Sequence, residues 1–182
     1  MHIARRGSLG FAAAAVALIA FGAFPASADG AHVASASGAL TANPAFVPNP
    51  TDPTTNPITD AAEGAVHLVV GADGRTIVTL HVAGLPAGRS FAAHLHRDGC
   101  STSFGGPHYQ APSGSSTGNA DREHEVWLDF TTNAAGNGRS LAVVPFEVLP
   151  GTRSVVIHQG AETPPGGVVV LSQRLACLDV TI

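Results

Sequence analysis

Short runs of apolar and β-branched residues recur along the chain, and Gly, Pro and Asn separate them. Asp73-Gly74 is a hairpin turn between two such runs. No stretch after residue 28 shows a helical period. We therefore predict an all-β fold, a Greek-key β-sandwich or flattened barrel of about eight antiparallel strands with long loops. Strands are expected at residues 32–40, 65–70, 76–83, 90–97, 125–132, 140–148, 153–158, 168–172 and 174–181.

Residues 1–28 follow a different pattern. Arg5 and Arg6 precede an alanine-rich apolar run at 10–24, and Ala26-Ser27-Ala28 follows it. This order is typical of a secretory signal peptide cleaved after Ala28, by the general or the twin-arginine route. The apolar run is too short to favour a permanent membrane span. We expect an exported protein, periplasmic, held at the cell envelope or released, without membrane attachment after cleavage.

The remaining chain is expected to form one domain. Residues 29–62 are rich in Pro, Asn, Thr and Ala and are interpreted as a mostly looped N-terminal segment, and 63–182 as the β-sandwich. A Gly-, Ser- and Pro-rich loop runs from 98 to about 123, and its length indicates a functional role.

Charge and cysteine content narrow the function classes. Cleavage would remove two of nine basic residues and none of thirteen acidic ones, so the exported chain is acidic. This balance argues against nucleic acid as a partner. Cys100 and Cys177 are the only cysteines, and export favours a disulfide between them over free thiols or metal-binding thiolates.

Histidine carries the clearest chemical signal. His94 and His96 are two residues apart in a predicted strand, so both side chains point to one face and can reach one metal ion. His108 lies in the long loop, and His158 ends another predicted strand. A single histidine of this kind is more often a surface residue than a ligand, but the pair favours metal binding.

Taken in order, several motifs resemble the copper/zinc superoxide dismutase family. The resemblance covers about residues 63–182, and the ordered set is more specific than any one motif. The motifs are Gly84-Leu85-Pro86-Ala87-Gly88, Ala93-His94-Leu95-His96, Cys100, Gly106-Pro107-His108-Tyr109, Ser154-Val155-Val156-Ile157-His158 and Arg174-Leu175-Ala176-Cys177.

The resemblance implies copper-dependent dismutation of superoxide to oxygen and hydrogen peroxide, an antioxidant oxidoreductase activity. It assigns the four copper ligands to His94, His96, His108 and His158. It assigns the disulfide to Cys100 and Cys177. Arg174 falls on the arginine that attracts and orients superoxide, a useful charge in an acidic chain. The alternative for Arg174 is an ion pair at the start of a strand.

The sequence departs from the family pattern at the zinc site. Residues 109–123 hold no histidine, and Ser116 stands where a zinc ligand is expected. His124 and Asp129 are candidates for the remaining zinc ligands, but their spacing of five differs from the family's three. The chain is thus similar to copper-only members, in which a carboxylate orients a ligand. Glu162 falls at such a position, with Asp121 and Glu123 as alternatives.

Two other functions stay open at this stage. The domain could store or carry copper with little turnover, or it could be a structural sandwich without metal. Arg174 favours the enzyme over the carrier, and the four histidines argue against the structural sandwich. The segment between His96 and Cys100 is shorter than in many relatives, so the oligomeric state is left open. His32, His67 and His81 have no role in the family.

Overall fold

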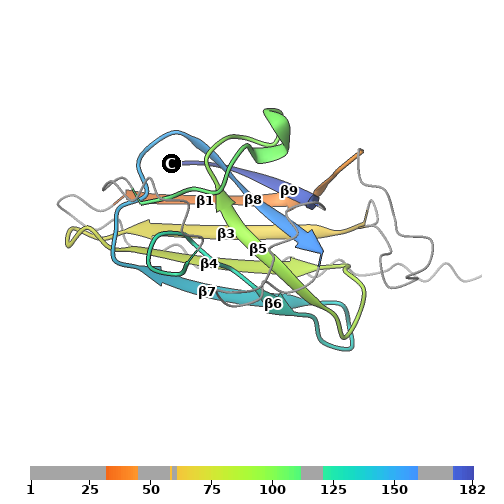
Figure 1. The fold of residues 1–182 in the computed structure, drawn as a ribbon. Coiled ribbons are helices and arrows are strands. Elements are labelled where there is room, and N and C mark those ends of the chain that lie inside the picture. Colours follow the sequence, from red (N-terminus) through yellow and green to blue (C-terminus); the bar gives the residue numbers. More distant parts are fainter. Residues whose placement is uncertain (1–31, 45–57, 59–60, 112–120, 160–173) are drawn as a thin grey trace, which may run out of the picture.

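The computed structural model describes residues 32–44, 58, 61–111, 121–159 and 174–182, which form two antiparallel β-sheets (Figure 1). This confirms the predicted all-β class. One sheet has the order β1 (His32–Ala39), β3 (Glu63–Val70), β4 (Thr76–Ala83), β7 (Gly138–Val144). The other has the order β2 (Thr41–Ala42), β9 (Arg174–Thr181), β8 (Thr152–Gln159), β5 (Ser90–His96), β6 (Phe130–Thr131).

The core lies between the two sheets because each strand turns every second side chain inward. Leu68 on β3 and Leu80 on β4 are fully buried, and Leu95 on β5 and Ile157 on β8 meet them from the other sheet. Each such side chain stabilises the fold by roughly 1.5–3 kcal/mol relative to an exposed one. On β5 and β8 the alternate residues therefore point to the outer face of the five-stranded sheet.

The strand order requires the chain to cross between the sheets. β4 and β7 are neighbours, although β5 and β6 lie between them in the sequence and belong to the other sheet. In Figure 1, β5 and β8 run obliquely across β3 and β4. β1 agrees with the strand expected at 32–40 and pairs with β3 along its whole length. The sheets form an open sandwich, not a closed barrel.

Two strands are shorter than predicted. In place of a continuous strand at 125–132, only Phe130–Thr131 forms β6, because the carboxylate of Asp129 accepts the Ala93 N–H at 3.2 Å. β7 ends at Val144, since Pro145 has no N–H to continue the ladder. The predicted strand at 168–172 lies outside the described residues.

Helical structure is minor in the described ranges. It consists of η1 (Ser103–Gly105), a single 3-10 turn in the loop after β5. None of the helices there is long and apolar enough to span a membrane.

A disulfide joins Cys100 in this loop to Cys177 on β9, as predicted. It links positions 77 residues apart, and Cys177 is fully buried. The bond ties the loop between β5 and His108 to the outer face of the five-stranded sheet.

We predict that replacing both cysteines by serine lowers the free energy of unfolding by about 4 kcal/mol, because the open chain regains the entropy of a long loop. Urea unfolding of the metal-free protein measures this. As a control, a reducing agent should shift the unfolding midpoint of the native protein and leave the double variant unchanged. Equal midpoints for the two proteins would show that the disulfide does not stabilise the fold.

Candidate metal centre

Four histidines converge on the outer face of the five-stranded sheet. One side-chain nitrogen from each of His94, His96, His108 and His158 lies within 4.8 Å of those from the other three. The ring centroids of His94 and His108 are 4.3 Å apart, and those of His96 and His158 are 5.3 Å apart. The four histidines singled out from the sequence thus form a compact group that could hold one metal ion.

The strands place three of these side chains. His94 and His96 point to the same face of β5, and β8 runs antiparallel beside it, with His94 opposite Val156 and His158 opposite Ala92. The imidazole of His158 therefore reaches the His94 ring diagonally across the two strands. The register shifts between Ile157 and His158, so His158 pairs with Arg174, the first residue of β9, at the edge of the site.

The loop after β5 places the fourth histidine, His108. Its backbone returns along β5, where the Tyr109 N–H donates to the Leu95 carbonyl at 2.8 Å and the Arg97 N–H to the Pro107 carbonyl at 2.9 Å. These bonds set His108 opposite His96. The loop also covers the site, which is why His94 and His96 are fully buried on an outer face.

Hydrogen bonds fix which nitrogens face the centre. Nδ1 of His96 lies 2.9 Å from the Gly106 carbonyl oxygen, which can only accept, so Nδ1 carries the proton and Nε2 keeps its lone pair. Nδ1 of His108 likewise donates to Glu125 Oε2 at 2.8 Å. Among the described residues, the buried Nε2 of His108 has no hydrogen-bond partner. A buried lone pair without a donor is costly, and a metal ion at this point would satisfy it.

Three of the four histidines are held in the neutral form that binds metal. Burial, and then repulsion from His108, lower the pKa of His96 to about 2 and that of His158 to about 3. Burial and the three neighbouring histidines hold the pKa of His94 far below its usual range. At neutral pH the imidazoles therefore keep their lone pairs available.

Glu125 is the carboxylate that contacts the cluster, and sequence reasoning missed it. It is 3% exposed and accepts hydrogen bonds from His108, from Trp127 Nε1 at 3.1 Å and from Gln110 Nε2 at 3.2 Å. Burial opposes its ionisation, but hydrogen bonds, first that from His108, lower the pKa of Glu125 below its ordinary value. The signal in the sequence was a carboxylate at the head of the apolar run 126–128.

The other acidic candidates have different partners, and of the described ones Asp129 comes near His94. Asp121 accepts a hydrogen bond from Nδ1 of His124 at 2.6 Å, and Glu123 is exposed. Asp129 pairs with Arg122 at 3.0 Å, and its Oδ1 lies 3.8 Å from Nε2 of His94. The group of four histidines does not include His124 or Asp129. Glu162 lies outside the described residues.

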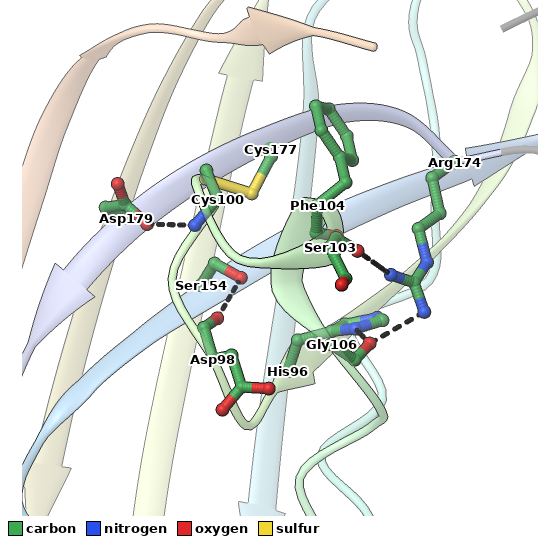
Figure 2. Close-up of a disulfide and its surroundings, with 10 residues drawn as sticks. All are labelled: His96, Asp98, Cys100, Ser103, Phe104, Gly106, Ser154, Arg174, Cys177 and Asp179. Atoms are coloured by element: carbon green, nitrogen blue, oxygen red, sulfur yellow. Dashed lines mark hydrogen bonds between the residues drawn. A yellow bond between two sulfur atoms is a disulfide. The ribbon is translucent and has the colours of Figure 1, made fainter. Parts of the chain in front are cut away.

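Arg174, the first residue of β9, lies beside the cluster (Figure 2). Its guanidinium donates to the carbonyl oxygens of Ser103 at 2.8 Å, Phe104 at 3.0 Å and Gly106 at 2.7 Å. Among the described residues, backbone carbonyls and no carboxylate hold the Arg174 side chain. The Gly106 oxygen thus accepts from both Arg174 and His96, so one carbonyl fixes the arginine and a cluster imidazole together.

Glycine is required at position 106. Its φ of +63° is in the left-handed region, and a Cβ there would collide with the Asp98 carboxylate. Ser103 and Phe104 also have positive φ, of 46° and 52°. This backbone turns the loop carbonyls toward Arg174.

The lowered histidine pKa values predict acid sensitivity of the metal-free protein. Below about pH 6.5 these histidines bind protons in the unfolded chain but stay neutral in the folded protein. The free energy of unfolding therefore falls as the pH falls toward about 3. Each such histidine contributes a loss of up to about 1.4 kcal/mol per pH unit. We expect a lower thermal midpoint at pH 5 than at pH 7.5, and a smaller decrease for His158→Gln. A midpoint that is the same at both pH values would contradict this account.

Comparison with known proteins supports the fold only. No protein-family model matches the chain, and no curated protein matches its sequence. A solved structure titled "Crystal Structure Analysis of the clock protein EA4" is similar, with a TM-score of 0.51 and 17% sequence identity over 82% of this chain and 93% of that one. At this identity the likeness shows a shared β architecture, and the function has to be argued from the histidine cluster itself.

Proposed function

We propose that the protein is a copper-dependent superoxide dismutase that acts outside the cytoplasm. The observation that carries the proposal is the compact group of four histidines, with three of the imidazoles buried and held neutral, beside the positive charge of Arg174. The motif order that resembles the copper/zinc superoxide dismutases supports the same function. In this reaction two superoxide anions and two protons give one oxygen and one hydrogen peroxide.

The donor set favours copper. All four donors are imidazole nitrogens, and imidazole suits copper, which binds tightest among the first-row divalent ions. The two cysteines are bonded to each other, so no thiolate competes for a softer metal. Bound copper would supply the one-electron redox chemistry that dismutation requires. His94, His96, His108 and His158 would hold it.

Arg174 would attract the substrate. After burial and the charge of His108, Arg174 is a further cause of the lowered pKa of His158, so its field reaches the cluster. The guanidinium is partly exposed, and three carbonyl oxygens fix its position. A fixed positive charge at the mouth of a site raises the local concentration of small anions. This matters in a chain of net charge −4.

Export rests on two observations. The pattern of residues 1–28, which lie outside the described residues, is that of a signal peptide. The Cys100–Cys177 disulfide is of a kind that persists in oxidising compartments. Superoxide that arises outside the cytoplasm would be the substrate there.

A copper store or carrier is the second candidate. The deep burial of His94 and His96 favours it, because a buried ion dissociates slowly. Arg174 favours the enzyme, since a carrier has no need of a fixed positive charge that attracts an anionic substrate.

We expect the exported protein reconstituted with copper to dismutate superoxide, and the protein loaded with zinc alone to be inactive. Metal content and superoxide consumption measured on the same samples test this. Copper bound at one equivalent without turnover would favour the carrier. Activity that persists after complete removal of copper would contradict the proposal.

Arg174→Ala should lower kcat/KM about tenfold or more at low ionic strength, because the anion loses its attraction to the site. Copper content should be unchanged, and the remaining activity should depend less on salt. Arg139→Ala, an exposed arginine on the other sheet, is the matched control and should behave like the native protein. Equal activity and equal salt dependence for Arg174→Ala and the native protein would exclude the steering role.

A further inference from the structure

One short segment, residues 122–129, reaches two of the four histidines from opposite ends. We propose that Arg122 and Trp127 are positioning residues that join the carboxylates facing His94 and His108, so that both imidazoles are held for copper without a second metal ion. The inference rests on copper binding to the cluster and extends the proposed function.

Trp127 acts at the His108 end. Its indole N–H donates to Glu125 Oε2 at 3.1 Å, the oxygen that also accepts the proton of His108 Nδ1 at 2.8 Å. Trp127 is 6% exposed and Glu125 3%, so solvent does not compete for this oxygen. The indole therefore limits the positions that the carboxylate, and with it the His108 ring, can take.

Arg122 acts at the His94 end. It donates to Asp129 Oδ2 at 3.0 Å, while Asp129 Oδ1 accepts the Ala93 N–H at 3.2 Å. Each carboxylate oxygen is thus engaged, and Oδ1 is kept 3.8 Å from Nε2 of His94. If Nδ1 of His94 binds the metal, Nε2 is the nitrogen left to face a carboxylate. Asp129 lies on this Nε2 side of the ring.

The two ends meet in a stack. The Arg122 guanidinium carbon lies 4.9 Å from the centroid of the Trp127 ring, and the Trp127 ring meets the His94 ring edge to face at 5.5 Å. A continuous set of contacts therefore runs from His94 through Asp129, Arg122, Trp127 and Glu125 to His108. The Arg122 side chain is 65% exposed, so its ion pair and its ring contact contribute little to overall stability. Their effect is to order the two histidines.

The charge of Arg122 has a second consequence. Glu125 and Asp129 place two carboxylates behind a site that is proposed to attract an anion. Arg122 offsets one of them on the His94 side, where it pairs with Asp129 at 3.0 Å. Glu125 and Asp129 thus act as acceptors that orient the two histidines, and Arg122 keeps the site from becoming strongly negative.

The test uses the exported protein loaded with one equivalent of Cu(II), as native protein and as Arg122→Gln and Trp127→Phe. The readouts are the Cu(II) paramagnetic resonance spectrum and the rate at which a chelator removes copper. We expect altered spectra and about tenfold faster removal in both variants, the usual scale for losing an outer partner of a ligand. Arg89→Gln is the matched control, since Arg89 lies over Phe91 at 5.6 Å in a similar cation–aromatic contact away from the histidines.

Two further measurements separate positioning from a general structural role. The thermal midpoint of metal-free Arg122→Gln should match that of the native protein, because the Arg122 side chain is 65% exposed, and Arg122→Lys should restore part of the native copper spectrum. The double variant should lose copper more slowly than the product of the single effects predicts, because both residues act through one set of contacts.

Trp127 is the only tryptophan in the chain, so quenching of its emission reports copper binding directly. Native protein that binds no copper would refute the proposed function and this inference with it. Native protein that binds copper, with Arg122→Gln and Trp127→Phe retaining its spectrum and removal rate, would refute this inference alone.

Discussion

The site depends on imidazole rings that are largely buried and fixed in orientation. A buried charged imidazole would repel its three neighbours, and a buried ring free to rotate would present its N–H to the centre as often as its lone pair. The Gly106 carbonyl and the Glu125 carboxylate remove this freedom, because they accept hydrogen bonds from the Nδ1–H groups of His96 and His108. The Nε2 atoms of His96 and His108 then turn their lone pairs away from these acceptors and toward the other rings.

The Gly106 carbonyl joins three parts of the protein. It accepts from His96 on β5 and from Arg174 on β9, and it belongs to the loop that the Cys100–Cys177 disulfide ties to β9 (Figure 2). Residues that are distant in sequence therefore act on one peptide group. His96 and Arg174 therefore cannot shift independently, and under the proposed function this would hold the anion-attracting charge in a fixed place relative to the copper ligand.

The sequence predicted most of this arrangement, for reasons that are local. The alternation of apolar and polar residues predicted β4 at its observed bounds, Thr76–Ala83. A spacing of two residues in one strand predicted that His94 and His96 lie on one face. The continuous strand at 125–132 did not form, because a side chain, that of Asp129, takes a ladder position that periodicity assigns to backbone. Glu125 was missed for a related reason. Its partner His108 is 17 residues away, and only the tertiary fold brings the two together.

Anomalous diffraction at the copper absorption edge, from crystals of the exported protein loaded with one equivalent of copper, tests the central claim most directly. Our account predicts one peak, enclosed by His94, His96, His108 and His158 with ring nitrogens at bonding distance. A peak at another place on the protein, such as His67 or His81, with none among the four rings, would contradict it.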